Sequence, residues 1–255
     1  GSLDVKSVPS EARIYIDGKE YGKTPNVIND ILIGEHELKL TKYDYEDLKK
    51  KITITEGKTL TINEKLFEIE LDETQQVVSG TVNGHDYVDL GLPSGLLWAT
   101  CNIGANYPEE YGDYFAWGEV KPKTEYTQSN YSNVTNEDSP SSTDAATTHW
   151  GGNWHTPTDA EWAELCEKCT WERTILSGVK GYKVISNING NSIFLPLGGF
   201  REDNSLNETR SSGCYWSSSL YSTNPLAYGV LLSDKGIGRR VYNRYYGFSI
   251  RPVCQ

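Results

Sequence analysis

Short runs of alternating apolar and polar residues fill the first quarter of the chain. Four runs place their apolar side chains on one face of an extended segment, at residues 13–16, 37–40, 51–54 and 59–62. Asp17-Gly18 and Glu56-Gly57 lie between runs and are typical of turns. This pattern predicts strands, and residues 3–68 are expected to form a small antiparallel β-domain.

The pattern changes after this region, and residues 77–255 are expected to form a second domain. One helix is predicted there, because Thr158 is a suitable N-cap and Glu161 completes a capping box three residues later. Its apolar face would be formed by residues at i, i+3, i+4 and i+7, namely Trp162, Leu165, Cys166 and Cys169. A Ser-, Thr- and Asn-rich tract at 124–148 predicts a long surface loop.

The charge of the chain is unevenly distributed. The net charge is −11, and this argues against nucleic-acid binding, which needs an excess of Lys and Arg. Residues 201–255 nevertheless hold four acidic and seven basic side chains, a net of +3. Two interpretations follow: the end of the chain faces an anionic or polar ligand, or its arginines pair with the acidic body of the protein.

The residues that commonly carry catalysis or bind metals form no recognisable site. Cys166 and Cys169 have CxxC spacing, but zinc normally needs four ligands and no second Cys or His pair follows. The sequence contains no HExxH, no GxSxG and no glycine-rich phosphate loop. We therefore expect no catalytic residues, no metal and no cofactor. A Cys214–Cys254 disulfide is one alternative for the five cysteines, and free buried thiols are the other.

A recognition surface is expected in the last quarter of the chain. Tyrosines, asparagines and arginines lie there among small residues, the mixture that evolved binding surfaces use for contact area and adaptable hydrogen bonds. The candidate ligand-binding residues are Tyr215, Tyr221, Asn224, Tyr228, Arg239, Arg240, Tyr242, Asn243 and Tyr245. The alternative is that several of these tyrosines are strand residues packed inward. Four tryptophans are assigned to the core: Trp98, Trp117, Trp162 and Trp216.

Three motifs in the first domain resemble a PEGA domain. They are VPSEARIYIDG at 8–18, GKTP at 22–25 and IGEH at 33–36, with Glu11 standing where the family has glycine. The resemblance implies a compact β-sandwich of the kind found as an accessory module in surface proteins of bacteria and archaea. It therefore implies a setting outside the cytoplasm.

Longer motifs in the second domain resemble the Fibrobacter succinogenes major paralogous domain. They are DLGLPSGLLWATCNIGA at 89–105, YGDYFAWGE at 111–119 and WHTPTDAEW at 154–162. This family is similar to the formylglycine-generating-enzyme branch of the C-type-lectin fold. The segments 215–219 and 245–253 also look like the closing motifs of this fold, including those of variable proteins diversified by retroelements.

The sequence lacks the motifs that two activities of related proteins require. Formylglycine-generating enzymes use a reactive cysteine pair, and Cys214 and Cys254 do not lie in such a motif. Calcium-dependent sugar binding in animal lectins uses an acidic-Pro-Asn loop and a Trp-Asn-Asp strand. Residues 223–225 (Thr-Asn-Pro) resemble the loop only weakly, and the sequence contains no Trp-Asn-Asp. The resemblance therefore implies binding without metal.

Together these observations predict an α+β protein: a small antiparallel β-sandwich followed by a C-type-lectin-like α+β domain. The expected function is that of an extracellular or cell-surface, adhesin-like bacterial protein whose ligand is a protein or glycan on another cell or in the environment. A leader carrying a signal peptide or lipid anchor is expected before Gly1, and this anchor would be the only contact with a membrane. The alternatives are a structural subunit of a surface appendage or envelope assembly, and an enzyme related to the formylglycine-generating enzymes.

Overall fold

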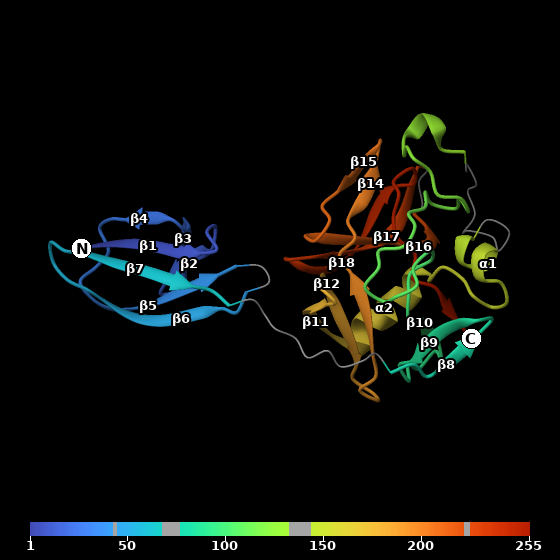
Figure 1. Cartoon of the computed structure of the whole chain (residues 1–255), viewed down its shortest axis with the longest axis horizontal. Helices are drawn as coiled ribbons and strands as arrows, with labels where there is room; N and C mark the ends of the chain where they lie inside the picture. Colours follow the sequence, from blue (N-terminus) through green and yellow to red (C-terminus); the bar gives the residue numbers. More distant parts are fainter. Residues whose placement is uncertain (43–44, 68–76, 133–143, 222–224) are drawn as a thin grey trace. The chain divides into compact units, whose positions relative to one another are not determined.

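The chain forms two compact units, which comprise residues 1–70 and 71–255. The computed structural model describes residues 1–42, 45–67, 77–132, 144–221 and 225–255 (Figure 1). Each unit has a hydrophobic core of its own, so the two are described separately.

The first unit consists of seven strands in two sheets. The strands are β1 Ser2–Val8, β2 Arg13–Ile16, β3 Lys19–Lys23, β4 Asn26–Ile28, β5 Gly34–Thr41, β6 Leu48–Ile54 and β7 Thr59–Lys65. One sheet has the order β4-β1-β7 and the other the order β3-β2-β5-β6. The four runs predicted from alternation lie in β2, β5, β6 and β7. Their apolar positions form one shared core, which includes Leu3, Val5, Ile14, Ile16, Leu38, Leu40, Ile52, Ile54 and Ile62.

The prediction of a purely antiparallel sandwich is wrong at one strand pair. Strands β1 and β7 run parallel, with Leu3 beside Leu60 and Val5 beside Ile62. The other pairs in this unit are antiparallel. Alternation of apolar residues decides which side chains face the core, but it carries no information about the direction of the neighbouring strand. The parallel pairing of the first and last strands of the unit was therefore not predictable from the alternation of apolar residues.

The second unit contains four small antiparallel sheets and little helix (Figure 1). Its strands are β8 Gly80–Val82, β9 His85–Asp89, β10 Leu97–Ala99, β11 Cys169–Leu176, β12 Val179–Ser186, β13 Ser192–Pro196, β14 Phe200–Glu202, β15 Ser205–Asn207, β16 Ser212–Leu220, β17 Leu226–Ser233, β18 Gly236–Asn243 and β19 Val253–Cys254. The sheet orders are β19-β10-β9-β8, β11-β12-β13, β14-β15 and β16-β17-β18.

The expected α+β class, with a C-type-lectin-like α+β second domain, is contradicted by the structure. Strands make up 50% of the chain and helical segments 8%, so the protein is mostly β. In the described residues the helices are α1 Ala145–Trp150, α2 Asp159–Lys168 and a 3₁₀ turn at Gln128–Asn130. Aromatic and β-branched residues favour strands, and they recur throughout the second unit. The loop expected at 124–148 also contains the beginning of α1.

Helix α2 begins where the sequence predicted it. The Thr158 side chain accepts from the Glu161 backbone, and the Glu161 side chain accepts from the Thr158 backbone. Trp162 and Leu165 are fully buried, as predicted from the helical spacing. Cys169 is buried too, but it starts β11 instead of continuing the helix. The four tryptophans assigned to the core are confirmed there, each no more than 1% exposed.

Candidate functional site

The predicted recognition residues lie on and around the three-stranded sheet β16-β17-β18. Strands β17 and β18 form a hairpin closed by the pair Ser233 and Gly236 (Figure 1). One face of this sheet packs on α2, and the Trp162 ring lies 5.9 Å from that of Tyr215. The opposite face packs on the closing loop of the chain, where the Trp216 ring stacks on Phe248. We call these the helix face and the loop face.

The structure places Tyr215 in the core and leaves Tyr242 half-buried against it. Tyr215 is 1% exposed, and its hydroxyl donates to the Pro196 carbonyl at 2.8 Å. Tyr242 is half-buried on the loop face, with its ring 4.9 Å from Phe248. Burial raises the pKa of both phenols above the usual value. Tyr215 is covered from the helix face, where its ring lies near Trp162 of α2, so its assignment to a recognition surface is corrected.

Two exposed side chains and one half-buried tyrosine form an aromatic and apolar surface on the helix face. Tyr228 lies directly opposite Val241 across the hairpin, and the Tyr221 ring meets the Tyr228 ring edge-on at 5.5 Å. Tyr221 and Val241 are each 37% exposed. We call Tyr221, Tyr228 and Val241 the tyrosine patch. Sequence analysis missed Val241, because a lone valine in a strand is more often a core residue than a contact residue.

A charged pair borders the tyrosine patch. Arg239 lies two residues before Val241 and therefore on the same face of β18. Its Nη1 donates to a carboxylate oxygen of Asp159 at 2.6 Å and to the Asp159 carbonyl at 3.2 Å. Asp159 is the first residue of α2, so this contact ties the sheet to the beginning of the helix. Arg239 thus pairs with the acidic body of the protein, as one of the two interpretations of the charge pattern expected.

Two more arginines of the basic C-terminal segment are internal. Arg251 is fully buried and donates to Asn102 Oδ1 and to the carbonyls of Ala99 and Thr100. Arg244 is 1% exposed and its guanidinium lies 4.9 Å from the centre of the Trp117 ring. The positive balance of residues 201–255 is therefore smaller at the surface than the sequence suggested.

The remaining predicted residues lie outside the tyrosine patch. Arg240 is exposed on the loop face, opposite Gly229 in β17. The Asn243 side-chain amide donates to the Tyr245 hydroxyl at 3.4 Å, and both residues are half-buried beside the loop that follows β18. Asn224 lies outside the described residues. The eight candidates that the structure describes are therefore divided between two faces and do not form one continuous surface.

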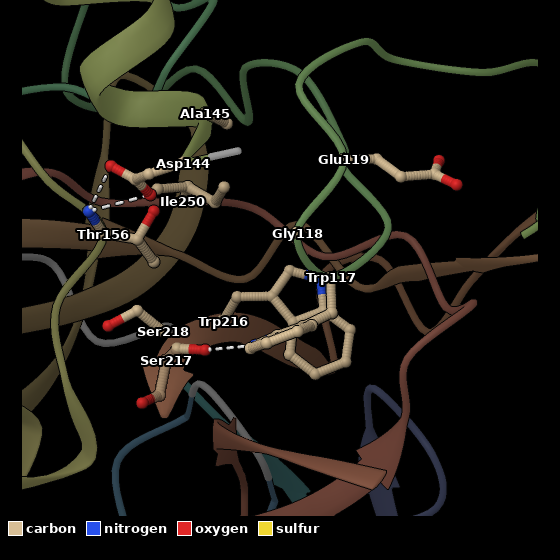
Figure 2. A pocket seen from close by; sticks show the side chains of 10 residues that line it. All are labelled: Trp117, Gly118, Glu119, Asp144, Ala145, Thr156, Trp216, Ser217, Ser218 and Ile250. Atoms are coloured by element: carbon tan, nitrogen blue, oxygen red, sulfur yellow. Dashed lines mark hydrogen bonds between the residues drawn. The ribbon is translucent and has the colours of Figure 1, made fainter. Parts of the chain in front are cut away.

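A small pocket lies beside the loop face (Figure 2). Trp117 and Trp216 line it together with Asp144, Thr156 and hydroxyl groups of β16. The Asp144 carboxylate is buried and already accepts from the Thr147 backbone and hydroxyl and from the Thr156 backbone. The cavity volume of the pocket is about 10 Å³. This is room for about one water molecule, so the pocket cannot hold a ligand.

Burial perturbs four thiols of the second unit. Burial raises the pKa of Cys166 and Cys254 to about 11 and that of Cys169 and Cys214 to about 12. Such thiols are weak nucleophiles at neutral pH. All five cysteines are free, so the Cys214–Cys254 disulfide is not formed. In the described parts of the chain, no cluster of three His, Cys, Asp or Glu side chains is arranged to hold a metal.

Comparison with known proteins assigns the first unit only. Residues 1–70 match the family model of the PEGA domain, so this unit is a PEGA domain. PEGA domains occur in extracellular or periplasmic proteins. No curated protein matches the chain. Among the described residues, no helix is long and apolar enough to cross a membrane.

Proposed function

We propose that the protein is an extracytoplasmic bacterial binding protein of the adhesin type, in which the second unit recognises a protein or glycan ligand. The PEGA domain serves as its spacer at the cell surface, where a lipid anchor attached upstream would hold it. The observation that carries this proposal is the tyrosine patch. Tyr221 is exposed and packs edge-on against Tyr228, which is half-buried in β17, and aromatic residues provide contact area at low entropic cost.

The chemistry of the second unit favours binding over catalysis. The pocket beside the loop face is water-sized, four thiols have raised pKa values, and Tyr228, Arg239, Arg240, Tyr242 and Asn243 lie in paired strands. The resemblance of residues 89–105, 111–119 and 154–162 to the Fibrobacter paralogous family supports the same proposal, since these motifs supply buried framework residues such as Trp98, Trp117 and Trp162. Buried framework residues of this kind hold the exposed residues of the neighbouring strands in fixed positions, as a ligand-binding surface requires.

An array of glycans and purified surface proteins tests this proposal. The labelled full chain is compared with the variant Tyr221→Ser, Tyr228→Ser, Val241→Ser on every spot. We expect the variant to lose at least about 100-fold in affinity for the ligand, because truncating aromatic anchors costs about 2 kcal/mol each. The matched control is Tyr107→Ser, which removes a tyrosine that is 62% exposed outside the patch. A ligand bound equally by the wild type and both variants would contradict the site.

We propose further that the exposed positions of this sheet are diversified among related strains, as in retroelement-diversified proteins. Support comes from the contrast between exposed Tyr221, Arg240 and Val241 and fully buried Trp216 and Arg251. Only the exposed set can change without a cost in packing. Sequencing of the locus from close isolates should find substitutions concentrated in the exposed set. An even scatter that includes Trp216 and Arg251 would contradict diversification.

A further inference from the structure

Strand β18 ends its sheet and has an open outer edge. The sheet order is β16-β17-β18, and no described residue pairs with the other side of β18. Arg239, Arg240 and Val241 are all exposed, although consecutive residues in a strand point to opposite faces. Exposure of three consecutive residues therefore shows that both faces of β18 are partly open at this point, and no described strand covers the edge between them. Such an edge is a template for one more strand.

The hairpin geometry shows which backbone groups this edge offers. Ser233 and Gly236 close the β17–β18 hairpin around a two-residue loop, so they form the first hydrogen-bonded pair. Hydrogen-bonded and non-bonded pairs then alternate along the ladder. The N–H and C=O groups of Ile237, Arg239 and Val241 consequently point away from β17, toward the open edge. Each of the three offers one donor and one acceptor.

The side chains beside this edge differ between the two faces. On the helix face, Val241 stands next to Tyr228 in the tyrosine patch and offers an apolar neighbour. On the loop face, Arg240 is flanked by Gly238 and Tyr242, and among the described residues it forms no ion pair. Arg239, in contrast, forms an ion pair with Asp159. An added strand would therefore meet an apolar surface and a free cation at adjacent positions.

We propose that the open edge of β18 binds an extended peptide segment of another protein as an added strand. In this segment an acidic side chain lies beside Arg240, and the neighbouring residue places an apolar side chain beside Val241. This inference rests on the proposed function and names the ligand class of the same site. Arg240, which is exposed and forms no ion pair among the described residues, supplies the charge complementarity, and the three outward backbone pairs supply hydrogen bonds that do not depend on sequence.

Self-pairing of two β18 strands is less favourable than binding of an acidic segment. In a two-fold antiparallel pair, a residue and its partner must lie on the same face. Pairing centred on Arg239 or Arg240 then places like charges directly opposite each other, which is destabilising. Charged residues of this kind commonly protect edge strands from pairing with their own copies. An acidic partner removes the repulsion, so the same charges that oppose a homodimer favour this ligand.

A random linear peptide library displayed on phage and selected on the full chain tests the proposal. We expect enriched peptides of about ten residues with an Asp or Glu next to a β-branched or aromatic residue. The strongest peptide is then synthesised in two forms, N-methylated at odd or at even positions. Because alternate amides of an added strand point away from β18, one form should lose at least about tenfold in affinity and the other should bind as before.

Two pairs of protein variants test the predicted contacts. Arg240→Ala should weaken binding of the selected peptide about tenfold, whereas Lys235→Ala, which removes a cation from the turn of the same hairpin, should change affinity less than about twofold. Val241→Pro removes an outward N–H without breaking a hydrogen bond to β17 and should weaken binding, whereas Val241→Thr also changes the side chain but keeps the N–H and should retain most of the affinity. Circular dichroism checks that each variant is folded, and the N-methylated peptides make the same test without altering the protein.

The outcomes separate this inference from the proposed function. Equal binding of both N-methylated forms would overturn strand addition, while loss of array binding in the tyrosine-patch variant would still uphold the binding site. Peptides enriched without an acidic residue, or indifferent to Arg240→Ala, would overturn the ligand class. Sedimentation that shows a dimer dissolved by Val241→Pro would assign the edge to a second copy of the chain and overturn the proposal.

Discussion

Arg251 shows how a single residue organises the core of the second unit. It is a fully buried cation held by one side-chain amide oxygen and two backbone carbonyls, and no carboxylate takes part in these bonds. Its second terminal nitrogen, Nη2, has no partner among the described residues. Burial lowers the pKa of this guanidinium. The acceptors come from the segment 99–102, so Arg251 joins the end of the chain to the beginning of the unit.

Replacement of Arg251 by lysine should destabilise the second unit by about 2–4 kcal/mol. Lysine keeps the charge but lacks the planar fork that reaches several acceptors, and hydrogen bonds to charged groups contribute about 1.5–3 kcal/mol each. Urea unfolding followed by tryptophan fluorescence measures the change. Arg240→Lys on the exposed edge is the matched control and should shift the free energy of unfolding by less than about 0.5 kcal/mol. Equal effects of the two changes would mean that the buried contacts contribute little.

Residue-scale prediction from the sequence succeeds for core tryptophans and fails for surface tyrosines. A tryptophan is so large that its burial is a safe expectation, and Trp98, Trp117, Trp162 and Trp216 confirm it. Tyr215 and Tyr228 have the same composition signal, but one is buried and the other lies in the tyrosine patch. Both side chains lie on the helix face, so strand alternation does not separate them. Tyr215 packs beside Trp162 of α2, whereas Tyr228 lies opposite Val241 in a more exposed part of the sheet. No local pattern shows which part of this face α2 covers.

At the scale of elements, α2 is held in place mainly by its first turn. The capping box of Thr158 and Glu161 satisfies two backbone donors. His155 Nε2 lies 3.2 Å from the other oxygen of Glu161, and Asp159 pairs with Arg239 of β18. The beginning of α2 therefore joins three interactions, one of which borders the tyrosine patch. This helix start was predictable because capping is local in sequence, whereas the Asp159–Arg239 pair spans 80 positions and needed the fold.

The stability of this helix start should depend on pH. Burial opposes the charged form of His155, but its hydrogen bonds to Glu161 and to the Asn153 carbonyl outweigh burial and raise its pKa above 6.5. Burial likewise opposes ionised Glu161, yet the bonds from His155 and Thr158 lower its pKa below 4.5. Because the pKa of His155 is raised in the folded state, this residue contributes stability below about pH 6.5, and the contribution is lost as pH rises through the folded pKa. Because the pKa of Glu161 is lowered in the folded state, this residue contributes stability above about pH 4.5, and the contribution is lost as pH falls through the folded pKa.

The difference in melting temperature between the wild type and Glu161→Gln should therefore be largest at about pH 5–6 and should shrink toward pH 8. Scanning calorimetry across this range measures it. Glu167→Gln provides the control, since Glu167 is exposed on the same helix and pairs with Lys168. A Glu161→Gln difference that stays constant with pH would show that the His155–Glu161 contact does not titrate with folding.

The pairing of β1 with β7 illustrates what element patterns leave open. Each strand was recognisable or adjacent to a recognisable run, and the shared core of the PEGA domain followed from their apolar faces. Their parallel pairing joins residues nearly 60 positions apart, such as Val5 and Ile62. This pairing forms only when the whole sandwich closes. It joins residues that are far apart in the sequence, so a local sequence pattern cannot predict it.

At the scale of the whole molecule, the two units have separate cores. The apolar cluster of the PEGA domain lies between Leu3 and Leu66, and the clusters of the second unit lie between Val82 and Cys254. All seven tryptophans belong to the second unit. Tryptophan fluorescence therefore reports on the second unit, whereas circular dichroism in the far ultraviolet reports on both. This separation makes the independence of the units measurable without cutting the chain.

Leu38→Ala should destabilise the PEGA domain and leave the second unit unchanged. Leu38 is fully buried in β5, and removal of such a side chain costs about 2–5 kcal/mol through lost burial and the cavity left behind. In urea, the part of the circular dichroism signal that belongs to the PEGA domain should shift to lower denaturant, while the fluorescence midpoint stays in place. Leu165→Ala, on the buried face of α2, is the matched control and should shift the fluorescence midpoint instead. A fluorescence midpoint that moves with Leu38→Ala would show that the two cores unfold as one, and the PEGA domain would then stabilise the second unit.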